Sequence, residues 1–295
     1  MAKPTIVICG PSPDAVGGGP THMRNLRASP LAAEFELVRF ETGSRGAESP
    51  ATDEPRLAML WRLFTSPFRL AAVLLARQPA IVHLNTSVDA KGFWREIPHL
   101  VVYRLLGVRV VYQIHGGTVD GLAPRGAVRA LARTVFRLPA AIVLLSPTER
   151  AQFERLGRMP RMVVIPNAVD TAAFRGRERA HRGTVRRLAY LGRLAEGKGV
   201  AESIEAVALL RGEEAFRDLE LSIAGSGPSR GALEERIAHL GLQDRVRLLG
   251  AIGGEEKVRF LRDADVLLLP TRLTEGLPYT ILEALAAGTP GCRPR

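Results

Sequence analysis

Two glutamates flank a turn near the end of the sequence. Glu275 comes directly before Gly276, and Glu283 follows eight residues later, inside a run that predicts a helix from Tyr279 onward. A glycine-containing turn at a helix start presents backbone N–H groups and the positive end of the helix dipole, which favours a phosphate. Carboxylates at these positions can accept hydrogen bonds from sugar hydroxyls. The spacing also fits a capped surface helix with two solvated glutamates.

A basic pair lies in a glycine-rich bend between a predicted strand, 187–191, and a predicted helix, 200–210. Arg193 and Lys198 are five residues apart in this bend, and a turn there can bring both onto one diphosphate. The chain has four lysines and 37 arginines, so its composition does not favour a lysine at this position. The alternative is a helix start with two exposed cations.

A histidine follows a nearly continuous apolar run, 108–114, of the kind found in parallel strands covered on both faces. His115 is followed by two glycines, so it can approach a substrate hydroxyl; a loop histidine without such a role is the alternative. Near the start, Gly17 and Gly18 stand between a predicted strand, 5–10, and a helix, which is a phosphate-facing arrangement. Gly-x-G-x-x-G spacing is absent, so an ordinary strand-to-helix turn also fits.

These motifs together resemble the family-4 glycosyltransferases, which are retaining enzymes of the GT-B fold. The resemblance implies a UDP- or GDP-sugar as donor, a glycan or lipid-linked acceptor, a role in envelope or exopolysaccharide synthesis, and no cofactor. The shared motifs, in family order, are Gly17-Gly-Gly19, His115-Gly-Gly117, Ile165-Pro-Asn-Ala-Val-Asp170, Gly192-Arg193 with Lys198-Gly199, Ile223-Ala-Gly-Ser-Gly-Pro228 and Glu275 with Glu283.

The resemblance also implies which groups stabilise the leaving diphosphate. Arg193, Lys198 and the amides of Gly276 and Leu277 would stabilise its negative charge. No metal is expected, because no His/Cys/Asp cluster has ligand spacing and the two cations can supply the positive charge. Asp263-Ala-Asp265 leads directly into an apolar run, so we interpret it as a helix-to-strand junction and not as a metal site.

The sugar and the ribose would be held by side chains. By resemblance, Glu283 binds the ribose hydroxyls, while Glu275 and His115 position the donor sugar; with Arg193 and Lys198 these last two form the expected catalytic set. The backbone positions expected near the nucleotide or its phosphates are Gly17, Gly18, Gly225 and Gly227, together with Gly276 and Leu277.

The order of predicted elements indicates an α/β protein with two Rossmann-like domains facing across a cleft. We expect an acceptor-side domain over 1–170, a linker over 171–185 and a donor-binding domain over 186–295. Family members continue beyond the last residues with further strands and helices. Gly291 to Arg295 does not resemble a strand, so we expect the second domain to be incomplete, its last helix to lack a sheet partner and the gene product to be truncated.

Composition places the chain in a reducing compartment. It has two cysteines, no signal peptide and no apolar run long enough to span a membrane, so we expect a cytoplasmic protein. Residues 1–175 carry a net charge of +9 and the remainder +2, which suggests an anionic partner at the first half. An arginine-rich genome would give the same bias.

Two segments could place the chain at the inner face of the cell membrane. A long helical stretch, 56–77, interrupted at Pro67, could lie in the bilayer interface or pack on a sheet. Arginines at 125, 129, 133 and 137 form a drifting stripe for lipid headgroups or a solvated face. We expect no nucleic acid partner.

Two other functions compete with sugar transfer. The chain could be a catalytically inactive remnant that binds only nucleotide or acceptor. A dinucleotide-dependent oxidoreductase is disfavoured by the missing fingerprint glycines and by the Arg193 and Lys198 pair.

Overall fold

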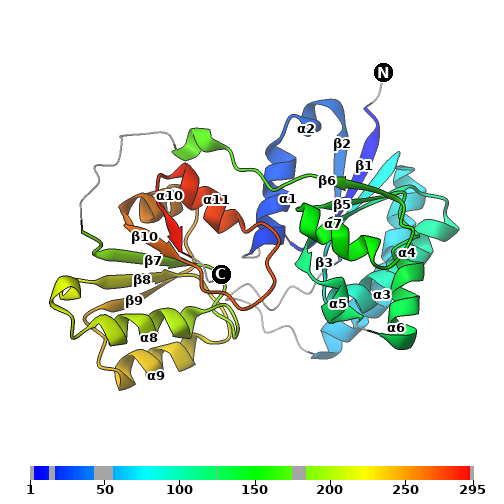
Figure 1. Cartoon of the computed structure of the whole chain (residues 1–295). Helices are drawn as coiled ribbons and strands as arrows, with labels where there is room; N and C mark the ends of the chain where they lie inside the picture. Colours follow the sequence, from blue (N-terminus) through cyan, green and yellow to red (C-terminus); the bar gives the residue numbers. More distant parts are fainter. Residues whose placement is uncertain (1–2, 13–16, 43–55, 124, 175–183, 293–295) are drawn as a thin grey trace. The chain divides into compact units, whose positions relative to one another are not determined.

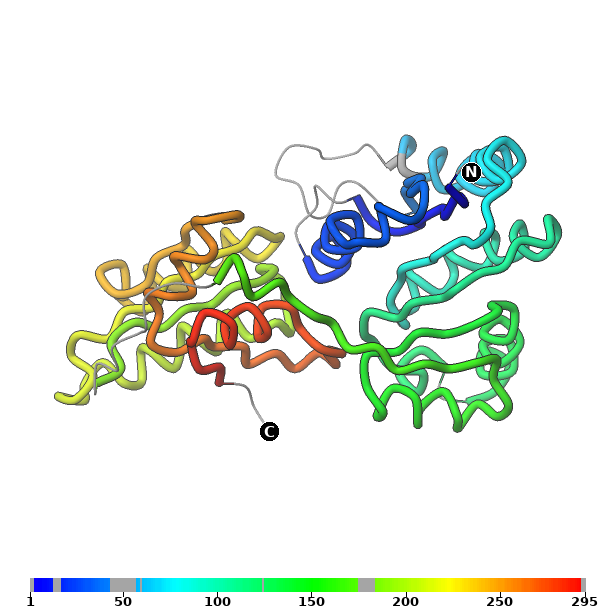
Figure 2. The backbone as a smooth tube through the Cα atoms, turned by 90° about the horizontal axis from the view of Figure 1, so that it is seen from above, coloured from blue at the N-terminus to red at the C-terminus, as the bar shows by residue number. Residues whose placement is uncertain are grey.

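The computed structural model describes residues 3–12, 17–42, 56–123, 125–174 and 184–292. The chain divides into two compact units. Unit 1 comprises Met1–Asn167 with Thr274–Leu277, and unit 2 comprises Ala168–Leu273 with Pro278–Arg295. Figure 2 follows the chain by colour, from blue and cyan in unit 1 to yellow and red in unit 2. Each unit is built on one parallel sheet, which confirms the predicted α/β class.

Unit 1 has a six-stranded sheet whose strands all pair in parallel (Figure 1). Its central strands are apolar because helices cover them, and Val7, Leu84, Tyr112 and Ile142 are completely or almost completely buried. The strands, in spatial order, are β2 (Glu36–Glu41), β1 (Thr5–Gly10), β3 (Ile81–Val88), β4 (Val110–Gly117), β5 (Ala141–Leu144) and β6 (Arg161–Val164).

The helices of unit 1 supply the rest of its core. α3 buries Leu70 and Leu74, and α4 buries Phe93, Leu100 and Tyr103 against the same cluster. The helices are α1 (Gly18–Ala28), α2 (Leu31–Glu34), α3 (Arg56–Arg77), α4 (Ala90–Leu105), α5 (Val119–Leu122), α6 (Gly126–Val135) and α7 (Pro147–Glu154).

The predicted interruption at Pro67 is wrong. α3 runs unbroken through Pro67, although a proline removes one helical hydrogen bond. The buried Leu70 and Leu74 fix the second half of the helix to the core, and Ser66 is bonded to His99 of α4 at 2.9 Å. Tertiary packing on both sides of the proline therefore outweighs its local preference.

Unit 2 has a five-stranded parallel sheet with helices packed on it (Figure 1). Leu221 and Ile223, on an inner strand, are fully buried, as are Ile204 and Val207 of the covering helix. Its strands, in spatial order, are β11 (Gly291–Cys292), β10 (Val266–Leu268), β7 (Arg187–Leu191), β8 (Glu220–Ala224) and β9 (Val246–Gly250). Its helices are η1 (Thr171–Phe174), α8 (Val200–Leu210), η2 (Glu214–Phe216), α9 (Arg230–His239), α10 (Gly254–Asp263) and α11 (Tyr279–Ala286).

Two expectations about unit 2 are corrected. Gly291 and Cys292 do form a strand, which pairs in parallel with β10: Leu267 N donates to Pro290 O at 2.8 Å, and Leu269 N donates to Cys292 O at 2.9 Å. α11 is therefore followed by a sheet partner. The expected linker also begins with a 3₁₀ turn, η1, whose Phe174 packs on a cluster of buried residues in this unit. The remainder of that linker, 175–183, lies outside the described residues.

Asp265 marks the junction between α10 and β10. Its Oδ2 accepts hydrogen bonds from the backbone N–H groups of Arg186 and Arg187, at 2.9 and 2.8 Å. These bonds fasten the start of β10 to the start of β7, so the interpretation of Asp263-Ala-Asp265 as a helix-to-strand junction is confirmed.

Candidate functional site

In unit 1, His115 lies near the carboxyl end of β4, next to Asn85 on β3. His115 Nε2 is 3.0 Å from Asn85 Oδ1. The amide nitrogen of Asn85 lies 3.2 Å from the carbonyl oxygen of Cys9 and 3.4 Å from that of His83. Carbonyl oxygens only accept, so the Asn85 nitrogen must face them and its oxygen must face His115. Nε2 of His115 therefore carries the hydrogen and donates it to Asn85.

The other ring nitrogen of His115 is consequently an acceptor. Burial, assisted by His22 and His83, lowers the pKa of His115 well below its usual 6.5, so the ring is neutral at pH 7. With its hydrogen on Nε2, the ring carries a lone pair on Nδ1. This buried Nδ1 has no hydrogen-bond partner among the residues that the structure describes. It is suited to receive the hydroxyl hydrogen of a bound ligand.

Two further histidines surround His115. The ring centroid of His22, on α1, is 4.4 Å from that of His115 and 6.2 Å from that of His83. His83 Nε2 lies 2.9 Å from Gln113 Oε1. α1 begins at Gly18 and Gly17 directly precedes it. Both predicted glycines therefore lie at the start of the helix whose His22 packs against His115. The described residues contain no group of three or more His, Cys, Asp or Glu that could hold a metal ion.

Replacing Asn85 by alanine is expected to release the tautomer of His115. In the wild type, ¹⁵N NMR should show a neutral ring protonated on Nε2; in Asn85→Ala it should show a mixture, because no acceptor fixes the ring. We expect a ligand hydroxyl to bind at Nδ1 about tenfold more weakly in this variant, because part of the population no longer offers the lone pair for a hydrogen bond. Gln113→Ala is the matched control, since it removes a buried amide bonded to His83 and leaves the Asn85 to His115 bond unchanged. A wild-type ring protonated on Nδ1 would contradict the assignment.

The buried histidines should make unit 1 less stable in acid. Burial lowers the pKa of His22 and His99 to about 4, and lowers those of His83 and His115. A lowered histidine pKa stabilises the fold above 6.5, and this stability is lost as the pH falls below 6.5. Glu96 opposes this, because burial raises its pKa from 4.5 to about 7 and its stabilisation is lost as the pH rises over that range.

Glu149 also opposes the loss of stability in acid, because burial raises its pKa. Four histidines against two glutamates predict a net loss of stability between pH 6.5 and pH 4.5. Each pKa unit corresponds to about 1.4 kcal/mol. Hydrogen exchange of the β3 and β4 amides measures the opening free energy of unit 1 alone. His22→Asn should make the opening free energy of unit 1 depend less on pH. An opening free energy of the wild type that does not change over this pH range would contradict the prediction.

The segment Thr274–Leu277 belongs to unit 1 and lies beside the end of β4. Gly117 N donates to Thr274 O at 3.5 Å, and Asn167 Nδ2 donates to Leu277 O at 2.7 Å. A Cβ on Gly116 would lie 3.5 Å from the nitrogen of Gly276. The structure thus brings Gly276, and with it Glu275, to the strand end that carries His115, as the motif order suggests.

Gly276 is a glycine because Glu149 and Leu145 occupy the space beside it. A Cβ at this position would lie 2.7 Å from Glu149 Oε1 and 2.8 Å from Leu145 Cδ1. Glu149 is held by a capping box: Ser146 Oγ accepts from Glu149 N at 3.1 Å, and Glu149 Oε2 accepts from Leu145 N at 2.6 Å. Burial raises the pKa of Glu149. The Ser-x-x-Glu pattern could have identified this support for the turn.

In unit 2, the hydroxyl of Tyr190 holds the bend that carries Arg193 and Lys198. The Tyr190 hydroxyl on β7 lies 3.3 Å from the carbonyl oxygens of both Arg193 and Lys198. Gly199 ends the bend with φ +82°, and a Cβ there would lie 2.2 Å from Pro270 O. The two predicted cations therefore sit on one closed, backbone-tethered bend at the carboxyl end of β7.

The turn containing Gly225 and Gly227 presses against this bend. Leu194 N donates to Ser226 O at 2.9 Å, and Gly192 N donates to Ala224 O at 3.0 Å. Gly225 and Gly227 have φ +148° and +158°, and a Cβ on them would lie 1.8 Å and 2.3 Å from backbone oxygens of the bend. Two glycine turns from neighbouring strands therefore form one backbone surface next to Arg193.

Glu283 is buried in unit 2 and not solvated. It lies on α11, and its Oε1 is 2.5 Å from Lys257 Nζ of α10. The solvated-glutamate alternative is therefore wrong for Glu283. No sequence motif marks Lys257 as a site residue. The only hint is that lysine is rare in this chain, which has four.

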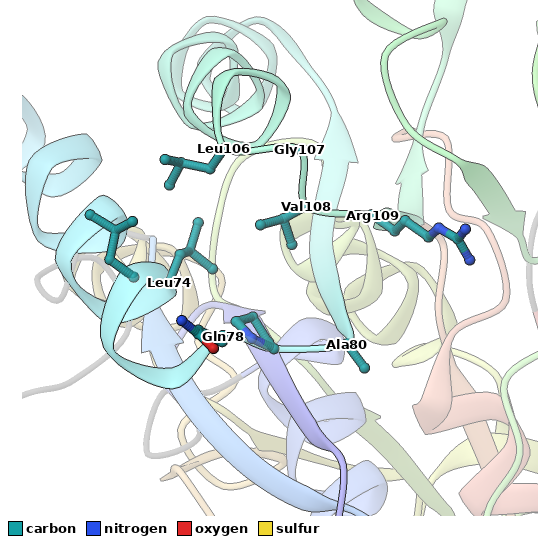
Figure 3. A pocket seen from close by; sticks show the side chains of 9 residues that line it. Leu74, Gln78, Ala80, Leu106, Gly107, Val108 and Arg109 are labelled. Carbon is teal, nitrogen blue, oxygen red and sulfur yellow. The ribbon is translucent and has the colours of Figure 1, made fainter.

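A cavity lies elsewhere in unit 1, before β3 and β4 begin (Figure 3). It has a volume of about 460 Å³ and is lined by Leu74, Gln78, Ala80, Val108 and Arg109 among others. These residues lie at the amino ends of the strands that carry Asn85 and His115 near their carboxyl ends. None of the predicted site residues lines this cavity.

Two family models match the chain. The model of Glycosyltransferase Family 4 matches residues 16–173, and that of Glycosyl transferases group 1 matches residues 175–291. The first covers more than half of the chain. The helices described here include none long and apolar enough to cross a membrane.

The sequence is also similar to individual glycosyltransferases. Alpha-D-kanosaminyltransferase of Streptomyces kanamyceticus is 31% identical over 70% of this chain, which corresponds to 58% of that protein. D-inositol 3-phosphate glycosyltransferase of Arthrobacter sp. is 33% identical, with 95% of this chain and 74% of that protein covered. The chain thus spans little more than half the length of the first of these relatives.

The fold is shared with solved glycosyltransferases. The Anabaena protein HepE, determined in complex with UDP-glucose, superposes with a TM-score of 0.70 at 17% identity, covering 98% of this chain and 80% of HepE. At that identity the likeness establishes the fold, which is GT-B. The two family models and the relatives above 30% identity add the lineage, and the chain belongs to glycosyltransferase family 4.

Proposed function

We propose that the protein transfers a sugar from a UDP- or GDP-sugar to a glycan or lipid-linked acceptor, with retention of configuration at the anomeric carbon. The observation that carries the proposal is the closed bend of unit 2, on which Arg193 and Lys198 stand beside the backbone surface of Gly225 and Gly227. That bend combines two cations with an approachable backbone, as a diphosphate requires. The UDP-glucose bound by HepE, which shares the fold, supports a nucleotide-sugar donor.

In the reaction, the bond from the anomeric carbon to the diphosphate oxygen breaks and its electrons go to the diphosphate. The acceptor oxygen forms the new bond on the same face of the sugar, and its proton goes to the leaving phosphate. Arg193 and Lys198, with the amides of Gly276 and Leu277, stabilise the charge that develops on that phosphate. No covalent intermediate with the protein is required.

The remaining residues position the donor. His115 Nδ1 accepts a hydrogen bond from a sugar hydroxyl, because Asn85 keeps its lone pair available. Glu275 stands on the turn held by Glu149 and accepts from other sugar hydroxyls. Glu283 accepts from the ribose, and its ion pair with Lys257 fixes the position of the carboxylate. Gly17 and Gly18 contribute backbone near the phosphates and the acceptor.

Thermal shift and product analysis test the proposal in sequence. UDP or GDP should raise the melting temperature, and NAD(P) should not; stabilisation by NAD(P) alone would support an oxidoreductase and overturn the proposal. Product formation from the stabilising nucleotide sugar separates the transferase from a remnant that only binds. The anomeric coupling of the product, measured by ¹H NMR, reports retention or inversion directly.

We also propose that the protein works in the cytoplasm, at the inner face of the cell membrane, in envelope or exopolysaccharide synthesis. The arginine stripe does not support the membrane contact, because two of its four members bind the protein itself. Arg129 donates to Asp120 Oδ1, Ala123 O and Arg155 O, and Arg137 donates to Arg158 O. The helix over 56–77 supports it.

A further inference from the structure

α3 exposes a stripe of large apolar side chains. Their spacing of three, four and seven residues places them on one side of the helix, opposite the buried Leu70 and Leu74. The rings of Trp61, Phe64 and Phe68 follow one another, with centroids 6.4 and 6.0 Å apart. The stripe consists of Leu57, Leu60, Trp61, Phe64, Phe68 and Leu75, which are 57% to 81% exposed.

α4 exposes a second apolar stripe next to the first. Trp94, Val101 and Leu105 recur at helical spacing and are 45% to 79% exposed. The two helices bury their other sides in the same core cluster and are joined by the buried Ser66 to His99 bond. Both stripes therefore face solvent on helices that pack on the same core, and together they are called here the α3–α4 face.

The α3–α4 face is positively charged as well as apolar. Residues 56–109 include eight Lys or Arg and two Asp or Glu, and α3 has no acidic residue. Neither acid lies free on the face: Asp89 caps α4 by accepting from Gly92 N at 2.8 Å, and Glu96 is buried 2.9 Å from Arg95. A second copy docking here would bring like charges together, so the charge favours an anionic partner.

The apolar surface continues past the end of α3. Leu75, exposed on the stripe, also lines the cavity of about 460 Å³, together with Leu106 and with Arg109 at its edge (Figure 3). Aromatic and leucine side chains bordered by arginine and lysine are the composition of helices that lie in the interface of a bilayer.

We propose that the α3–α4 face binds the surface of an anionic lipid bilayer. Trp61, Phe64 and Trp94 insert at the level of the headgroups, and Arg69 and Arg104 lie beside lipid phosphates. The proposal extends the proposed function by naming the surface on which an acceptor is met. Binding to lipid is measured without donor or acceptor, so its failure and the failure of sugar transfer are separate results.

The chain provides its own probe, because its two tryptophans, Trp61 and Trp94, both stand on the α3–α4 face. Vesicles of phosphatidylcholine with about a third phosphatidylglycerol should shift the tryptophan emission to shorter wavelength, and brominated lipids should quench it. Pure phosphatidylcholine vesicles should give a much smaller shift. Absence of any shift or quenching with the anionic vesicles would overturn the proposal.

Variants separate the face from general stickiness. Phe64→Ser with Phe68→Ser should weaken cosedimentation with anionic vesicles by about tenfold, and Arg69→Gln with Arg104→Gln should do so most strongly at low salt. Leu209→Ser is the matched control, since Leu209 is 82% exposed but lies on α8 of unit 2. Unchanged circular dichroism shows that each variant folds. Emission that is blue-shifted without lipid and reverts on dilution would indicate a homodimer at this face and overturn the proposal.

Discussion

Alanine in place of Lys198 or Arg193 is expected to slow sugar transfer by about 100- to 1000-fold while the fold survives. Each cation would stabilise charge that appears on the diphosphate only as the glycosyl bond breaks, so the loss should fall mainly on kcat. Tyr190 holds the backbone of the bend, so neither substitution should unfold unit 2. Steady-state kinetics with the active donor and circular dichroism check both parts.

Arg217→Ala is the control for this experiment. Arg217 is an exposed cation of the same unit, and its contacts are with Glu214 and Asp218 near η2. Its loss should leave the rate unchanged, since surface ion pairs contribute little. If wild type, Lys198→Ala and Arg193→Ala turn over equally fast, both residues are excluded from the mechanism.

Gly225→Ala is expected to destabilise unit 2 by about 4 kcal/mol or more and to abolish donor binding. The new Cβ would lie 1.8 Å from Gly192 O, a backbone atom that can move only with the whole bend. The φ of +148° would in addition be strained for alanine. The substitution thus displaces Arg193 without touching its side chain. Urea unfolding and nucleotide titration measure the two effects.

Gly231→Ala is the matched control for this substitution. Gly231 lies in the first turn of α9, and a Cβ there would meet no atom within 4 Å. Alanine is the better helix former, so the variant should be as stable as the wild type or more stable by up to about 1 kcal/mol. Equal stability of Gly225→Ala and Gly231→Ala would show that the turn with Gly225 does not pack against the bend with Arg193 as described.

The strands were predictable because each is a short apolar run that must be covered on both faces. The expected strands 5–10 and 187–191 reappear as β1 and β7 with the same bounds. β11 was missed because Gly291 and Cys292 have no strand preference of their own; their strand exists through pairing with β10. The continuity of α3 was missed because the packing around Pro67 involves residues of another helix.

The site was predictable to the extent that function constrains single turns. The bend with Arg193 and Lys198 and the turn at Gly276 combine glycines with charged residues, and such local patterns are visible in the sequence. The pairing of Asn85 with His115 and that of Lys257 with Glu283 have no local signature. Asn85 acts on His115 across 30 residues and Lys257 on Glu283 across 26, so only the fold reveals either pair.

The tetrapeptide Thr274–Leu277 has a consequence for the order of synthesis. It completes unit 1, yet Leu277 meets Asn167 only after 110 further residues have been translated. Until then the nascent chain must display Leu145, Glu149 and Gly117 without their cover. Most of unit 1 therefore leaves the ribosome first, but its folding is completed only after most of unit 2 has been synthesised. Chaperones that protect nascent chains should stay bound to unit 1 until then.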